Sequence, residues 1–251
     1  MRRRRSAGPP QPCRALVSGG SGGIGAAVCK ALAAAGMHVI VHAGSRLDRA
    51  EQVVAEIIAA GGQAEAVRFD LGDEAACSAA MTRLTEPEPL AVVVHNAGIH
   101  DDAPLAGMTA LQWQRVIDIN LNAFYRLVQP AMLGMARLRW GRVVAISSVA
   151  ARLGNRGQAN YAAAKAGLHG AVICLTREMA ARGITANTVA PGLVDTDMLD
   201  SADSEQALAL VPAGRLGRPE EIAALVAFLC SDQAAYINGQ LIGIDGGMAP
   251  G

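Results

Sequence analysis

Short apolar runs alternate along the chain with longer stretches of helical character. The runs consist mostly of Val, Ile, Leu and Ala without polar alternation, which is typical of strands buried on both faces of a sheet. Seven runs are predicted to be strands: 15–18, 38–42, 64–69, 90–95, 142–147, 185–190 and 240–244. The stretches between them are predicted to be helices: 23–35, 47–60, 73–85, 110–138, 160–182 and 219–231.

Glycine and proline mark where these elements end and begin. Gly36, the Gly61–Gly62 pair and Gly183 lie where helices should stop, because glycine tolerates the backbone that closes a helix. Pro219, followed by two glutamates, is typical of a first helical turn. The repeated strand–helix order predicts a parallel sheet with helices on both faces. No linker, repeat or low-complexity block interrupts it, so we expect one α/β domain over residues 13–251.

The composition excludes several classes of protein. Of the 251 residues 51% are apolar and 18% are charged, which is enough apolar surface to offset the entropy of ordering the chain. Lys and Arg together number 22, as do Asp and Glu, so the formal net charge is zero. Arg2 to Arg5 account for four of the cations, which leaves the rest of the chain mildly acidic. We therefore expect no nucleic-acid partner.

The N-terminus and the cysteines bear on the compartment. No stretch reaches the ~18 uninterrupted apolar residues of a membrane helix, so we expect no membrane partner. No apolar segment follows the basic residues 1–12, so we interpret them as a disordered tail or as the result of a misassigned start codon, not as a secretion signal. Five scattered cysteines without a Cys-x-x-Cys pair favour neither a zinc site nor a disulfide framework. We expect a cytoplasmic protein without a bound metal.

A glycine-rich turn follows the first predicted strand. Its sequence over residues 18–25, Ser-Gly-Gly-Ser-Gly-Gly-Ile-Gly, runs directly into a predicted helix. Glycines let backbone N–H groups approach a pyrophosphate, and the helix N-terminus adds a favourable dipole. The position between a strand and a helix is the context that a dinucleotide-binding turn requires. A purely structural turn is the alternative.

The residues after the second predicted strand bear on the choice of dinucleotide. NAD-binding proteins usually place an acid there to accept from the ribose 2′-OH, and this chain has none. Ser45 and Arg46 instead offer a hydroxyl and a guanidinium, which suit a 2′-phosphate. This pattern favours NADP(H), unless Arg46 is only an exposed residue that opens a helix.

A tyrosine and a lysine lie one helical turn apart further along the chain. Tyr161 and Lys165 share one face of their predicted helix. A nearby ammonium lowers the pKa of a phenol, which would make Tyr161 a proton donor to a carbonyl oxygen. Ser148 closes a predicted strand, and α/β folds place their sites at the carboxyl ends of strands. Asn120 lies among apolar residues of the predicted helix 110–138, where it could hold a water molecule or bend the helix.

Together these motifs resemble the short-chain dehydrogenase/reductase family over about residues 14–248. The glycine turn is similar to the family's T-G-x-x-x-G-I-G, with Ser18 in place of Thr. Residues 95–98 are similar to its N-N-A-G, with His95 in place of the first Asn. Four residues fall on its catalytic tetrad: Asn120, Ser148, Tyr161 and Lys165. The resemblance implies a Rossmann-like, doubly wound, seven-stranded parallel sheet with helices on both faces.

The resemblance also implies a role for each matched residue. Tyr161 would protonate the ketone oxygen, and Ser148 would hydrogen-bond to it. Lys165 would bind the nicotinamide ribose and lower the pKa of Tyr161, while Asn120 would hold a water molecule of the proton relay. Asp70 and Leu71 would meet the adenine. The implied cofactor contacts are Gly19, Ser21, Gly22, Gly23, Ile24, Gly25, Ser45, Arg46, Asp70, Leu71, Asn96, Ala97, Gly98, Tyr161, Lys165, Pro191, Gly192, Val194 and Thr196.

Later segments resemble the 3-oxoacyl-[acyl-carrier-protein] reductases of this family. The matching segments are residues 154–161, 189–198, 211–217 and 234–240. The implied reaction is NADPH-dependent reduction of a 3-oxoacyl thioester on acyl carrier protein. In that group two arginines dock the acidic carrier protein, and Arg139 and Arg182 fall on their places. Solvated arginines at helix ends are the alternative.

Two departures from that group bear on cofactor and pathway. Gly22 stands where the group usually has an arginine for the 2′-phosphate, so NADP preference depends on Ser45 and Arg46. Residues 197–212 are expected to form a mobile lid and are fewer than in housekeeping enzymes. Together with residues 154–157, this segment is similar to reductases of aryl-polyene and polyketide pathways.

Other functions and the assembly stay open at this point. Another alcohol dehydrogenase of the family, acting on a CoA ester, a sugar or a steroid, would carry the same tetrad. The presence of Tyr161 and Lys165 disfavours a nucleotide sensor or scaffold on the same fold. The family usually forms tetramers, and the Ala-, Leu- and Met-rich helices 110–138 and 160–182 suit such an interface. We expect His100 and the two aspartates after it to be solvated rather than to line a substrate mouth.

Overall fold

A seven-stranded parallel sheet forms the centre of the computed structural model, which describes residues 8–86, 88–196 and 208–250. The strands are β1 (Arg14–Ser18), β2 (His38–Ala43), β3 (Gln63–Arg68), β4 (Val92–His95), β5 (Gly141–Ile146), β6 (Ile184–Pro191) and β7 (Leu241–Ile244). They lie in the order β3-β2-β1-β4-β5-β6-β7. The order reverses between β1 and β4, and ligands of doubly wound sheets bind at such a switch point. The predicted fold class is confirmed.

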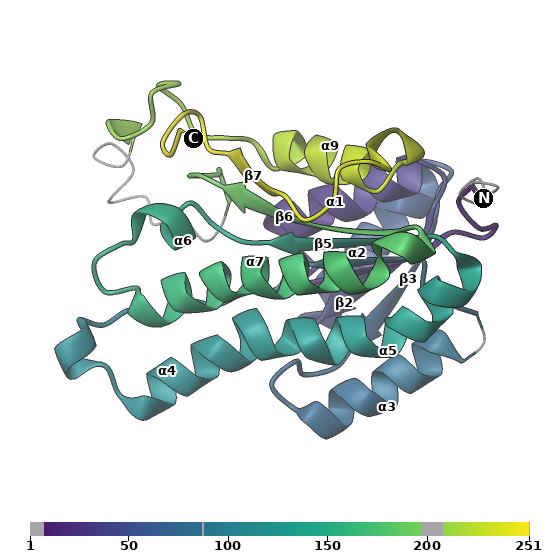
Figure 1. The fold of residues 1–251 in the computed structure, drawn as a ribbon, viewed down its shortest axis with the longest axis horizontal. Helices are drawn as coiled ribbons and strands as arrows, with labels where there is room; N and C mark the ends of the chain where they lie inside the picture. Colours follow the sequence, from purple (N-terminus) through teal and green to yellow (C-terminus); the bar gives the residue numbers. More distant parts are fainter. Residues whose placement is uncertain (1–7, 87, 197–207, 251) are drawn as a thin grey trace.

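Helices cover both faces of the sheet and bury one apolar core on each. Helices α1 (Gly23–Ala34), α2 (Leu47–Ala59) and α9 (Pro219–Leu229) pack on the first face. Helices α3 (Glu74–Thr85), α5 (Ala123–Leu138) and α7 (Ala159–Met179) pack on the second (Figure 1). Along β2, Val39 and Val41 face the first core and Ile40 faces the second. Both faces of the strand are apolar for this reason.

The predicted helix 110–138 is wrong as one continuous element. It consists of α4 (Ala110–Ile117), a π-helical turn (Asp118–Asn122) and α5. The Asn120 side-chain amide donates to the Val116 carbonyl oxygen, one turn back, at 2.8 Å. A side chain that takes a helical carbonyl oxygen competes with the backbone hydrogen bonds of the helix. The π turn interrupts the regular helix at Asn120, while a bend and a bound water molecule there stay predictions.

Short elements complete the described chain. They are η1 (Leu105–Gly107), α6 (Ala150–Leu153), η3 (Ala180–Arg182) and η5 (Asp232–Ala234). The first seven residues of the predicted tail, and residues 197–207 of the predicted lid, lie outside the described residues. Within the described part, no helix is both long and apolar enough to cross a membrane.

Candidate active site

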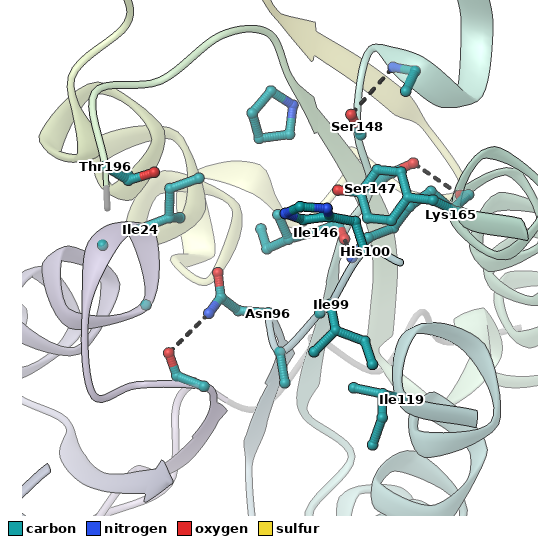
Figure 2. A pocket seen from close by; sticks show the side chains of 18 of the residues that line it. Ile24, Asn96, Ile99, His100, Ile119, Ile146, Ser147, Ser148, Lys165 and Thr196 are labelled. Atoms are coloured by element: carbon teal, nitrogen blue, oxygen red, sulfur yellow. Dashed lines mark hydrogen bonds between the residues drawn. The ribbon is translucent and has the colours of Figure 1, made fainter. Parts of the chain in front are cut away.

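One large pocket opens at the carboxyl ends of β1, β4, β5 and β6, and every residue predicted to contact the cofactor lines it. Its volume is about 1510 Å³, whereas usual ligand pockets have ~300–1,000 Å³. It therefore has room for a dinucleotide and a second molecule. Ile24, Asn96 and Thr196 lie on one side of it, and Ser147, Ser148 and Lys165 face them from the other (Figure 2).

The glycine turn forms the side of the pocket that suits a pyrophosphate. Gly19 and Gly23 have φ angles of 64° and 52°, which favour glycine. A Cβ at Gly25 would run into the Gly19 carbonyl oxygen, so the turn closes tightly only with glycine there. Among the described residues no side chain caps α1, and its first turn contains no acid. The residues of this helix end line the pocket, and their N–H groups can donate hydrogen bonds to an anion.

The residues predicted to recognise a 2′-phosphate lie at the rim of this half. Ser45 and Arg46 are exposed and line the pocket, with Arg46 directly before α2. A Cβ at Gly22 would meet no atom within 4 Å, so the place of the family's usual arginine is open space. Ser45 and Arg46 therefore fit a phosphate, and no acid competes with it at the end of β2.

The predicted catalytic residues meet on the opposite side. Ser148 follows β5, and Tyr161 and Lys165 lie one turn apart on α7. The buried Ser147 hydroxyl donates to the Lys165 carbonyl oxygen at 2.8 Å, which ties α7 to the end of β5. The Lys165 ammonium is buried, donates to the Ile146 carbonyl oxygen at 2.9 Å, and lies 5.6 Å from the centre of the Tyr161 ring.

The protonation states of this pair differ from the sequence expectation. Burial raises the pKa of Tyr161, the Asp102 carboxylate raises it further, and a hydrogen bond to Ser148 opposes both. Lys165 was expected to lower this pKa, but its ammonium is held by Ile146 and does not hydrogen-bond to the phenol. Burial also lowers the pKa of Lys165 to about 8. At neutral pH the site therefore holds a protonated phenol beside a largely charged ammonium.

Asn120 lies behind the pocket surface rather than on it. It is fully buried, and its amide nitrogen donates to the Ile99 and Val116 carbonyl oxygens, both at 2.8 Å. Its Oδ1 is buried and has no partner among the described residues. A Cβ at Gly98 would lie 2.6 Å from this Oδ1 and 3.0 Å from the Lys165 Nζ. Only glycine at position 98 therefore lets Asn120 and Lys165 approach each other.

Comparison with known proteins agrees with this geometry. A family model described as Enoyl-(Acyl carrier protein) reductase matches residues 19–249. This chain belongs to the short-chain dehydrogenase/reductase family. It is 44% identical over 236 residues to the 3-oxoacyl-[acyl-carrier-protein] reductase of Synechocystis sp., covering 93% of this chain and 96% of the relative. It is 43% identical over 238 residues to the Escherichia coli enzyme FabG, covering 93% and 96%.

Two solved structures of this family share the fold. One, provisionally described as an NAD(P)-dependent gluconate 5-dehydrogenase from Beutenbergia cavernae, contains NADP at low occupancy. It has a TM-score of 0.89 and 35% identity and covers 94% of this chain and 96% of its own. The other, provisionally described as a gluconate dehydrogenase from Agrobacterium tumefaciens, has a TM-score of 0.89 and 34% identity and covers 94% and 95%. The NADP of the first agrees with the cofactor that Ser45 and Arg46 indicate.

Sequence reasoning missed how this short-chain reductase anchors its catalytic helix. Asn160 is fully buried beside Tyr161. Its amide nitrogen donates to the Asp101 carbonyl oxygen at 3.1 Å and to that of Gln112 at 3.3 Å, and its Oδ1 accepts from the Tyr161 N–H at 2.8 Å. These bonds fix the first turn of α7. The signal available in the sequence was an asparagine directly before the tyrosine, at the start of a helix.

His100 and Asp102 are exposed, as expected of solvated residues, and they also form part of the pocket lining. The His100 Nδ1 lies 3.5 Å from an Asp102 carboxylate oxygen, and the Gln158 amide donates to the other oxygen at 2.8 Å. This part of the pocket therefore has a polar edge.

The two predicted docking arginines lie far from the pocket. Arg139 closes α5 just before β5 begins, and Arg182 ends η3 just before β6 begins. The Arg139 guanidinium donates to the Ala181 carbonyl oxygen at 3.4 Å, so the two arginines are neighbours. They lie at the amino ends of strands whose carboxyl ends form the pocket. Within the described chain, no group of three or more His, Cys, Asp and Glu residues is placed to hold a metal ion.

Proposed function

We propose that this chain is an NADP-dependent oxidoreductase that reduces a 3-oxoacyl thioester on acyl carrier protein to the 3-hydroxyacyl thioester. The observation that carries the proposal is a set of exposed apolar side chains in the lining of the pocket. Leu111, Leu153 and Leu210 all line the pocket and are 77%, 57% and 68% exposed. Exposed leucines at a pocket mouth favour a ligand with an apolar chain. The names of the curated relatives support the same substrate.

The residues divide the reaction between them. Bound NADPH supplies the hydride that reduces the ketone carbon. Ser148 donates a hydrogen bond to the ketone oxygen, and Tyr161 donates the proton that completes the alcohol. The phenol of Tyr161 is protonated at neutral pH, because burial raises its pKa from an ordinary value that is already alkaline. The Lys165 ammonium, which uses one donor on Ile146, would hold the ribose with the others. The Asn120 Oδ1, which has no partner among the described residues, would bind a water molecule that resupplies protons.

Assembly and carrier docking belong to the same proposal. Tyr125 and Leu133 on α5 and Ile173 on α7 are 66%, 71% and 37% exposed, which supports a homotetramer built on these helices. Arg139 and Arg182 form the docking pair for the acidic carrier. Because both lie away from the pocket, their replacement by glutamate should raise the KM for a carrier-bound substrate and leave that for the CoA thioester unchanged. An equal rise for both substrates would contradict docking there.

Pathway and compartment are the finer parts of the proposal. The resemblance of residues 154–157 supports an aryl-polyene or polyketide substrate, and turnover of short saturated but not polyenyl carrier substrates would contradict it. The five cysteines are all unpaired, four of them buried, which supports a reducing cytoplasm.

A second function has specific support. The two structural neighbours are described as gluconate dehydrogenases, and the polar edge of His100 and Asp102 suits hydroxyl groups. The deciding assay follows oxidation of NADPH and NADH with acetoacetyl carrier protein, acetoacetyl-CoA and 5-ketogluconate. NADPH-selective turnover that is fastest with the carrier substrate is expected. Turnover of 5-ketogluconate alone would be consistent with the family but would show that the proposed substrate is wrong. Cofactor binding without turnover of any substrate would favour a nucleotide sensor.

A further inference from the structure

A buried histidine joins the glycine turn to Asn120. His95 is the last residue of β4 and is fully buried. Its Nδ1 lies 3.2 Å from the Ser18 hydroxyl oxygen, and its Nε2 lies 3.0 Å from the Asn120 carbonyl oxygen. Ser18 ends β1 at the start of the glycine turn, whereas Asn120 lies in the π turn. The imidazole thus spans the two halves of the site.

The hydrogen bonds around Ser18 determine which ring nitrogen carries the proton. The Ser18 oxygen accepts from the N–H groups of Asn96 at 3.0 Å and Ala97 at 3.1 Å. Both of its lone pairs are then in use, so its own proton must point to the His95 Nδ1. The Nδ1 is therefore an acceptor, and the proton of a neutral ring sits on Nε2, from which it is donated to Asn120. Burial, reinforced by the Lys165 charge, lowers the pKa of His95 to about 3, which agrees with a neutral ring.

This bond reaches the part of the helix where the backbone ladder is interrupted. Asn120 lies in the π turn, and its side-chain amide takes the Val116 carbonyl oxygen. The same residue presents its Oδ1 beside Lys165 across Gly98. A change in the position of the Asn120 backbone would therefore move the Oδ1 relative to the lysine.

We propose that His95 is a positioning residue for the reduction, which holds the Asn120 backbone at a set distance from the glycine turn through a neutral imidazole with its proton on Nε2. The kinetic test of this proposal rests on the proposed function, whereas the NMR test of the histidine tautomer does not. His95 touches neither cofactor nor substrate, because it lies behind the pocket surface and does not line it.

Three variants test the proposal by steady-state kinetics, NADPH fluorescence titration and thermal unfolding. His95→Leu keeps an apolar side chain of similar size but offers neither donor nor acceptor, and His95→Gln keeps one of each. Thr188→Val is the matched control, because Thr188 is fully buried in β6 and its hydroxyl has no partner among the described residues. A displacement of about 1 Å in an active site can cost on the order of a hundredfold in rate.

The expected result is a split between turnover and binding. His95→Leu should lower kcat by about tenfold or more, and its NADPH affinity should change by less than about threefold. His95→Gln should recover most of the kcat, and Thr188→Val should leave it unchanged. A His95→Leu enzyme with wild-type kcat, or a His95→Gln enzyme as slow as His95→Leu, would overturn the proposal.

The tautomer of His95 can be measured without an activity assay. Long-range ¹H–¹⁵N spectra of the wild-type protein with ¹⁵N-labelled histidines report which ring nitrogen is protonated, and His95→Leu assigns the signal. A neutral ring with its proton on Nε2 is expected from pH 7.5 to 5. A proton on Nδ1, or a charged ring at neutral pH, would overturn the proposal. A wild-type protein that binds NADPH but reduces no 3-oxoacyl substrate would instead overturn the proposed function.

Discussion

Acidification from pH 7.5 to 5 should destabilise the fold through two buried histidines, His42 and His95. The His42 Nδ1 accepts from the Gly19 N–H at 3.2 Å, and its Nε2 donates to the Phe69 carbonyl oxygen at 2.9 Å. Burial lowers the pKa of His42 to about 4 and that of His95 to about 3. An unfolded histidine titrates near ~6.5. Below that pH the unfolded chain binds more protons than the folded chain, so this stability is full above the unfolded pKa and lost as the pH falls.

The size of the effect depends little on the folded pKa values, since both lie well below 5. Each pH unit between 6.5 and 5 costs about 1.4 kcal/mol per histidine. Each histidine then contributes about 2 kcal/mol and the pair about 4 kcal/mol. Carboxyl groups affect the stability of the fold at lower pH than the histidines do. The pKa values of Asp118 and Glu221 are lowered in the fold, so their stabilisation is lost only as the pH falls below about 4.5.

Urea unfolding at one protein concentration measures this loss at pH 7.5, 6.5 and 5. His95→Gln removes one titrating group, so the difference between pH 7.5 and 5 should shrink by about 2 kcal/mol. Thr188→Val titrates no group, so it should keep the wild-type difference whatever its effect at each pH. A wild-type loss of less than about 1 kcal/mol would show that these imidazoles are not held neutral, and the reasoning from burial would be wrong.

Three further substitutions test the site. Tyr161→Phe should lower turnover by at least about a hundredfold with little change in NADPH affinity. In the wild-type enzyme, the raised pKa of Tyr161 predicts that the rate of ketone reduction declines only at alkaline pH, where the rate of alcohol oxidation rises. Gly98→Ala should lower kcat by about tenfold or more, because its Cβ would meet Asn120 and Lys165, while Gly107→Ala, which would meet no atom within 4 Å, should not. Leu153→Ser should raise the KM of a C8 thioester about tenfold more than that of a C4 thioester, a difference of about 1.4 kcal/mol. Ile58→Ser, equally exposed at 57% but outside the pocket lining, is its control, and a chain-length series of substrates is the measurement.

The sheet could be predicted because most strands are short runs rich in Val, Ile, Leu and Ala, although β3 and β6 also contain polar residues. The strand order then follows from the short-chain reductase resemblance, and β1 to β7 all lie within two residues of their predicted boundaries. The glycine turn could be predicted as well, since it is a local motif between a strand and a helix. Such features depend on residues that are close in sequence, so the sequence alone is enough to predict them.

The π turn and the histidine bonds could not be predicted in this way. The Asn120 side chain also donates to the Ile99 carbonyl oxygen, 21 positions away, and the His95 ring is held by Ser18, 77 positions away. The sequence signal was a histidine at the end of each of two Val-rich strands, His42 and His95. A polar ring inside a core requires partners, but its sequence neighbours do not identify them.

The Tyr161–Lys165 pair shows most clearly where spacing stops being informative. A four-residue interval on a helix places both side chains on one face, but this spacing is compatible with either a raised or a lowered pKa of the phenol. The direction of the pKa shift depends on whether desolvation or the nearby charge has the larger effect. In this protein burial has the larger effect on the pKa of Tyr161. The Lys165 ammonium instead donates to the carbonyl oxygen of Ile146, the last residue of β5. A phenol with a raised pKa stays protonated at neutral pH, as an ordinary phenol does, but it is a weaker acid, so burial opposes the proton transfer that the Lys165 charge was expected to favour.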